Sequence, residues 1–176
     1  MSDTYRTSID IDAAAERVFD HFVRPELLVR WMGDFARLQA VEGGVFSVDI
    51  NGVLIRGHFV RVERPHLLEI AWGEAGNQAM PPGATRLRVT FEERDGKTHV
   101  ELEHSGLVPV EAAKHAVGWP HFVERLGVAA AGGDPGPDPW EVSPPGQEGG
   151  QKNAPAGVQN EGDGASWGVG HRAGPK

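Results

Sequence analysis

Two segments with strict alternation of apolar and polar residues, joined by a short turn, place the strongest limit on the fold. Thr85–Glu93 and Thr98–Ser105 flank the turn sequence Arg94-Asp-Gly-Lys97, which is typical of a β-hairpin. The residues on the shared apolar phase are Leu87, Val89, Phe91, Val100, Leu102 and His104. Since side chains alternate between the two faces of a strand, the pattern predicts an antiparallel sheet with one buried face.

Shorter segments of the same kind predict the rest of the sheet. Gly43-Gly44 and Asn51-Gly52 supply turn signals between them, and Asn-Gly is a strong hairpin signal. The further predicted strands are Arg6–Ile11, Leu38–Glu42, Val45–Ile50, Leu54–Val62 and His66–Trp72.

Two helices are predicted between the first strand and the second. Asp12 is a suitable N-cap for a helix from Ala13 to about Val23. Pro25-Glu26 suits the first turn of a second, short helix that ends near Trp31-Met32.

The periodicity changes to that of a helix after Pro109. Apolar and aromatic positions then recur at spacings of four, three and four residues, which predicts a helix lying on the sheet. Pro120 removes a backbone donor, so a break or kink is expected there. The stripe consists of His115, Trp119, Phe122 and Leu126. The order β-αα-β6-α predicts an α+β fold in which a curved antiparallel sheet wraps around a long C-terminal helix.

The composition divides the chain near residue 131. Residues 132–176 hold 12 of the 24 glycines and 7 of the 13 prolines, with three aliphatic side chains larger than alanine. Such a segment buries too little apolar surface to offset the entropy of ordering it. We therefore expect one folded domain over residues 1–131 and a mostly disordered tail over 132–176, from which Trp140 folds back on the domain.

Charge and composition exclude several classes of protein. A net charge of −8 without a basic stripe disfavours nucleic-acid and anionic-membrane partners. The absence of cysteine excludes disulfides, iron–sulfur clusters and thiolate zinc sites. No apolar segment approaches the length that spans a membrane. These features favour a soluble, cytoplasmic protein.

No pattern for metal or nucleophilic catalysis emerges. His99 and His104 lie five apart on a strand, hence on opposite faces. His115 and His121 are not at the i,i+4 spacing of a zinc-binding helix. Gly-x-Ser-x-Gly is absent, and Gly43-Gly44 precedes a strand, which does not fit a phosphate loop. No metal, cofactor or paired catalytic carboxylate is expected.

Six short motifs occur in the order found in one known family. They are Pro25-Glu26 followed by Trp31, Gly43-Gly44-x-Phe46, Gly57-x-Phe59-x-x-Val62, Trp72-Gly73, Glu103-His104-x-Gly106 and His115-x-x-Gly118-Trp119. Together they resemble the activator of heat-shock protein 90 ATPase homologue-like family, part of the START-like, helix-grip (SRPBCC) superfamily. The resemblance spans about residues 5–131, with an extension to Asp138-Pro-Trp140. Pro120 and the tail after Glu141 depart from it.

The resemblance implies a deep cavity between the sheet and the last helix, usually for a hydrophobic or amphipathic small molecule. It implies no shared catalytic set, since members include carriers, cyclases and cochaperones. The expected ligand-binding residues are Trp31, Phe46, Phe59, Trp72, Phe91, His104, Trp119 and Phe122.

Three functions stay open at this point. The first is a non-enzymatic carrier of a small molecule, acting as a monomer or homodimer. The second is a cyclase-like enzyme with His104 as general acid or base, although a bonded core histidine is the commoner case. The third is a module that binds a chaperone. His115, near the start of its helix, is expected to be exposed.

Overall fold

Residues 2–141 are described in the computed structural model, and they form one antiparallel sheet with three α-helices. The strands follow the spatial order β1-β7-β6-β5-β4-β3-β2. They are β1 Asp3–Ile11, β2 Phe35–Leu38, β3 Val45–Ile50, β4 Val53–Glu63, β5 Leu67–Glu74, β6 Thr85–Arg94 and β7 Lys97–Leu107. The helices are α1 Ala15–Val23, α2 Pro25–Leu28, α3 Pro109–Ala130 and the short 3-10 helix η1 Pro139–Glu141. The predicted order of elements is confirmed.

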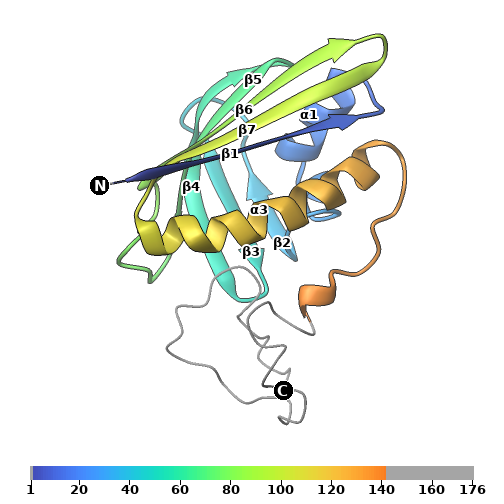
Figure 1. The fold of residues 1–176 in the computed structure, drawn as a ribbon. Helices are drawn as coiled ribbons and strands as arrows, with labels where there is room; N and C mark the ends of the chain where they lie inside the picture. The colour runs from blue at the N-terminus through green and yellow to red at the C-terminus, as the bar shows by residue number, and fades with distance from the viewer. Residues whose placement is uncertain (1, 142–176) are drawn as a thin grey trace.

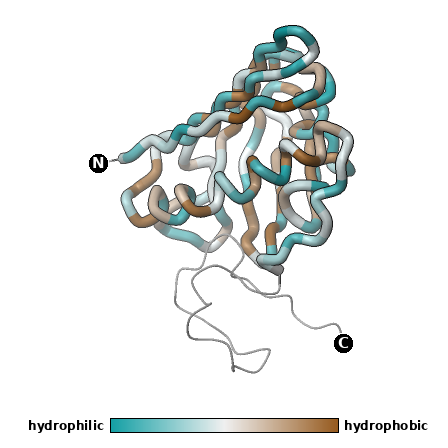
Figure 2. The backbone as a smooth tube through the Cα atoms, turned by 45° about the vertical axis from the view of Figure 1, so that its right-hand side comes forward, coloured by the Kyte–Doolittle hydropathy of each residue, from teal (hydrophilic) through white to brown (hydrophobic). Residues whose placement is uncertain are grey.

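The β6–β7 hairpin has the register that its alternation predicts. Leu87 lies opposite His104, and Val89 lies opposite Leu102. Along β6 the burial alternates between buried and exposed positions over most of its length. Hydrophobic and hydrophilic residues accordingly alternate along the chain in Figure 2. His104 therefore points toward the interior, as expected.

Helix α3 lies across the open side of the curved sheet (Figure 1). Its sheet contacts are mainly with β1 and, less extensively, with β7. The helix continues through Pro120, so the predicted interruption is wrong. Pro120 and Ala116, the residue four positions earlier, are both exposed. Water can therefore solvate the carbonyl that loses its donor, and the helix persists.

Two other local predictions are wrong. Strand β2 covers Phe35–Leu38 instead of Leu38–Glu42, because Leu38 already pairs with Phe46 and the chain then turns. Helix α1 has Ala14 as its N-cap, with no capping side chain there. The carboxylate of Glu93, from β6, accepts a hydrogen bond from the backbone N–H of Ala15 instead (2.9 Å). Both outcomes depend on partners distant in sequence.

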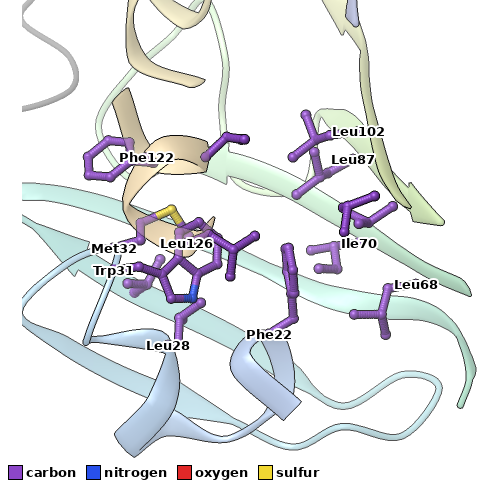
Figure 3. Close-up of a cluster of buried hydrophobic side chains, with 14 of the residues drawn as sticks. Phe22, Leu28, Trp31, Met32, Leu68, Ile70, Leu87, Leu102, Phe122 and Leu126 are labelled. Carbon is purple, nitrogen blue, oxygen red and sulfur yellow. The ribbon is translucent and has the colours of Figure 1, made fainter. Parts of the chain in front are cut away.

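One continuous hydrophobic core fills the space between the sheet and the helices. Figure 3 shows Phe122 and Leu126 of α3 near Trp31 and Met32, with sheet residues such as Ile70 beyond them. Phe22 meets Trp31 edge to face, with ring centroids 5.0 Å apart. The core therefore joins all three helices to the inner face of the sheet.

Candidate functional site

The eight predicted site residues all lie in the core, and each is at most 3% exposed. Five of them form one group beneath α3, in which Phe46, Trp72 and Trp119 lie in succession, with ring centroids 5.8 and 5.4 Å apart. Phe59 and His104 complete this group, contacting Phe46 and Trp72 respectively.

The remaining three predicted residues belong to the same core and have further aromatic partners. Phe91 and Trp31 both contact Phe22, at 5.5 and 5.0 Å. Phe122 contacts His121 and Trp140. The structure thus places the predicted apolar residues in one continuous core cluster, with His104 buried beside them.

His104 lies at the centre of a directional chain of hydrogen bonds. The indole N–H of Trp119 donates to Nδ1 of His104 (3.0 Å). The proton of the neutral ring then belongs on Nε2, which donates to the hydroxyl oxygen of Thr85 (2.8 Å). That hydroxyl in turn donates to the carbonyl oxygen of Trp72 (2.8 Å). The chain therefore connects α3 to β7, β6 and β5.

These bonds limit what His104 can do chemically. Burial lowers the pKa of His104 well below its usual value near 6.5, and the neighbouring His115 lowers it further. Both ring nitrogens already have partners. To act as a general acid or base, His104 would have to give up one of them, so this arrangement favours a hydrogen-bonding role.

His115 is 1% exposed, so the prediction that it is exposed is wrong. It lies one helical turn before Trp119, on the face that α3 turns toward the core. Its Nδ1 bonds to the carbonyl oxygen of Glu111 (2.7 Å), and its ring lies 4.8 Å from that of His104. Burial lowers the pKa of His115 to about 4, although Glu111 opposes the shift. His115 is therefore neutral near pH 7.

Glu111 is a buried carboxylate that the sequence interpretation missed. It is 1% exposed, and the side-chain amide of Asn77 donates to Oε2 (2.9 Å), with Lys114 Nζ 3.4 Å away. The same amide donates to Glu74 Oε1 (2.9 Å), so the β5–β6 loop is bonded to the start of α3. Burial raises the pKa of Glu74, and Glu111 adds to the effect. The sequence held one sign of this burial: Glu111 lies four residues before His115, which places both side chains on the same face of α3.

Two pockets lie away from this group. One, of about 240 Å³, lies between α3, the α2–β2 segment and residues 134–138, and Trp31 and Arg125 are among its lining residues. The other, of about 590 Å³, lies over β1, β6 and β7 and is lined largely by polar side chains such as Arg88 and Glu101. Beneath α3, by contrast, the aromatic rings contact one another directly.

Metal and membrane signatures are lacking in the part of the chain that the structure describes. Among residues 2–141, no three His, Asp or Glu side chains are grouped so that they could hold a metal ion. Within the same range, no helix combines the length and apolar character needed to cross a membrane.

A curved antiparallel sheet closed by one long C-terminal helix defines the START-like, helix-grip class of folds. The chain belongs to the family described as activator of Hsp90 ATPase homolog 1-like proteins, which it matches over residues 12–131. No curated protein matches it.

Solved structures agree with this assignment. An AHSA1-like protein from Rhizobium etli is 35% identical, with a TM-score of 0.63 over 79% of this chain and 88% of that one. The Aha1 dimer from Colwellia psychrerythraea is 21% identical, with a TM-score of 0.65 over 74% and 98%. An HSP90 activator from Plasmodium falciparum is 18% identical, with a TM-score of 0.59 over 70% and 92%. The last two show similarity of fold alone.

Proposed function

We propose that this protein binds a hydrophobic or amphipathic small molecule between the sheet and α3, and acts as a carrier. The observation behind the proposal is a group of aromatic side chains that surrounds a hydrogen-bonded histidine in the interior. The aromatic rings would provide the apolar walls, and His104 would orient a polar group of the ligand. The proposed binding residues are Trp31, Phe46, Phe59, Trp72, Phe91, His104, Trp119 and Phe122.

The packing of α3 supports this location. The helix contacts the sheet mainly along β1, whereas large side chains such as Trp72 and Phe46 fill the space in front of the central strands. Burial of apolar ligand surface supplies affinity, and a few polar groups fix orientation in sites of this kind. Because the rings contact one another directly, a ligand would have to move them apart to enter.

A polar group of the ligand would compete for the hydrogen bond between Trp119 and His104. A ligand hydroxyl inserted between them could accept the indole N–H of Trp119 and donate to Nδ1 of His104, so both buried nitrogens would keep a partner and a penalty of about 1–3 kcal/mol would be avoided. A ligand carbonyl could only accept from Trp119 and would leave Nδ1 without a donor. An apolar ligand without such a group would leave the existing bond intact. The site could therefore hold an apolar ligand or an amphipathic ligand with one hydroxyl group.

The experiment is a titration with 1-anilinonaphthalene-8-sulfonate, an amphipathic fluorescent probe, on the full chain. We expect saturable binding of one probe per chain and at least about a tenfold change in affinity in Trp119→Ala, once folding has been verified. Val117→Ala is the matched control, since Val117 is 53% exposed on the other side of α3. Equal affinities in all three proteins would contradict the proposal.

A second candidate is a chaperone-binding module, which the charged outer surface of β1, β6 and β7 favours. Arg6 pairs there with Glu103 (2.7 Å), next to Arg88 and Glu101 in the larger pocket. Stimulation of a Hsp90 ATPase that is lost in Arg88→Glu would support it, and no stimulation by the wild-type chain would remove it. We also propose that the protein is cytoplasmic and acts as a monomer or homodimer.

A further inference from the structure

Residues 132–141 turn back along the last three turns of α3 and form a segment that we call the strap. The reversal takes place at Gly132, whose φ of +101° favours glycine. Figure 1 shows the strap leaving the end of α3, reversing direction and running below the helix to η1. The family match ends at residue 131, so the strap lies beyond it.

Arginine side chains hold the first half of the strap. The guanidinium of Arg125, on α3, donates to the carbonyl oxygen of Gly136 (2.9 Å) and also to those of Trp31 and Arg30 (3.3 and 3.4 Å). Arg30 donates to the carbonyl oxygen of Gly133 (2.9 Å). The strap is thereby bonded both to α3 and to the segment that follows α2.

The second half is held by a hydrogen bond between His121 and Asp138 and by an aromatic stack. Nε2 of His121 lies 2.9 Å from Oδ1 of Asp138, which also accepts the backbone N–H of Trp140 (2.9 Å). Burial raises the pKa of Asp138, but the bonds from His121 and Trp140 outweigh this and hold it below its usual value. The indole of Trp140 lies flat on the His121 ring, with centroids 3.6 Å apart. It also meets Phe122 edge to face at 5.7 Å.

The strap covers one end of the aromatic core. Trp140 shields Phe122, which is a residue of the proposed binding set. Asp134 and Asp138 of the strap face Trp31, another member of that set, across the pocket of about 240 Å³. The strap therefore lies between solvent and the end of the proposed cavity where α3 meets the α2–β2 segment.

We propose that the strap is a displaceable cover on the ligand site, and that release of Trp140 from His121 and Phe122 opens the route into the core. This inference rests on the proposed ligand-binding function. The side chains of His121 and Arg125 hold the strap. Its backbone has positive φ at Gly132 and Gly136, a conformation that glycine adopts readily. The backbone N–H groups of Gly132 and Gly133 close the last turn of α3 by donating to the carbonyl oxygens of Ala129 and Val128 (3.1 and 2.9 Å), so these two residues stay in place. Residues 134–141 can detach without loss of any sheet or helix hydrogen bond.

The consequence of a cover is kinetic. Removal of the Trp140 stack, which is worth up to about 1.5 kcal/mol in such pairs, would raise the open fraction by as much as about tenfold. Association and dissociation of a ligand would then both accelerate, because each step passes through the open state. The affinity of the ligand would change much less than its association and dissociation rates.

The test is stopped-flow association of 1-anilinonaphthalene-8-sulfonate with the wild-type full chain and with three variants. Trp140→Ala is expected to accelerate association about tenfold, and Asp138→Asn, which removes the charge but little volume, to accelerate it less. Trp167→Ala is the control for the loss of a tryptophan outside the strap. Thermal unfolding of each variant establishes that the domain remains folded.

The possible outcomes separate the two proposals. Faster association in both strap variants, with the control unchanged, supports the cover. Wild-type rates in both, with the probe still bound beneath α3, overturn the cover and leave the binding function intact. No probe bound beneath α3 in any of the proteins overturns the binding function and the cover together.

Discussion

At the scale of single residues, the main feature of the interior is a buried histidine whose ring nitrogens both have hydrogen-bond partners. His104 has a partner for each ring nitrogen, and the chain of bonds ends on a backbone carbonyl in β5. A neutral ring in one tautomer fits this arrangement, because a second ring proton would meet the donor N–H of Trp119. The same bonds that stabilise the fold thus oppose protonation of His104.

Thr85→Val tests this chain by removing a hydroxyl with little change of shape. The Nε2–H of His104 and the carbonyl of Trp72 would each lose a buried partner, so the free energy of unfolding should fall by about 1–3 kcal/mol. Urea unfolding measures it. Thr90→Val, on the outer side of the same strand, should change stability by no more than about 0.5 kcal/mol. Equal effects of the two substitutions would show that the chain contributes little.

Buried histidines also make stability depend on pH. The pKa of His115 is about 4 in the folded state and near 6.5 when unfolded, so the unfolded chain binds more protons between these values. The contribution of neutral His115 to the free energy of unfolding is therefore fully present above about pH 6.5. It is lost as the pH falls toward 4, and the loss is on the order of 3 kcal/mol. His21 and His104 act in the same direction. His99, whose pKa Asp10 raises, acts oppositely but is exposed.

Denaturant unfolding at a series of pH values measures this dependence. His115→Gln should flatten the profile between pH 6.5 and 4, whereas His58→Gln, at an exposed position, should leave it unchanged. A profile in His115→Gln as steep as that of the wild type would contradict the assignment.

At the scale of elements, the β5–β6 loop and α3 are joined through one amide. Asn77 bonds to Glu111 and Glu74, and its own Oδ1 accepts the backbone N–H groups of Ala79 and Met80. Met80 is buried in the core. The loop is therefore a fixed part of the wall beside the first turns of α3.

Asn77→Ala should loosen this junction. Buried Glu111 would lose the amide bond to Oε2 and keep the contact with Lys114 Nζ at 3.4 Å, so the free energy of unfolding should fall by about 1–3 kcal/mol. Amide exchange should accelerate across residues 75–84, as measured by hydrogen–deuterium exchange. Gln78→Ala, at an exposed position in the same loop, should change neither quantity. Unchanged exchange in Asn77→Ala would show that the loop is held by Met80 instead.

The elements that sequence could predict are those with local causes. The β6–β7 hairpin and the stripe on α3 follow from alternation and helical spacing, and both are confirmed. The burial of His115 also follows from that stripe, to which it belongs, and the expectation of exposure relied only on its position near the start of the helix. Strand β2 depends on pairing with β3. Glu111 is buried because Asn77, distant in sequence, covers and binds it. Such dependence on remote partners is invisible in a local pattern.

At the scale of the whole molecule, the folded part of the chain continues past the residues that match the family model. The chain belongs to the activator of Hsp90 ATPase homolog 1-like family over residues 12–131. Residues 132–141 pack against α3, whereas the expectation of disorder beyond Glu141 lies outside the described residues. The sheet, α3 and the strap together enclose the aromatic core in which we place the ligand.

The most direct test of that placement is a heteronuclear NMR titration of the full chain with 1-anilinonaphthalene-8-sulfonate. We expect the largest shifts at the indole N–H of Trp119 and at the signals of Trp72 and His104, and we expect them to saturate at one probe per chain. Shifts concentrated on the outer face, at Arg88 and Glu101, with Trp119 unmoved, would contradict a ligand site between the sheet and α3.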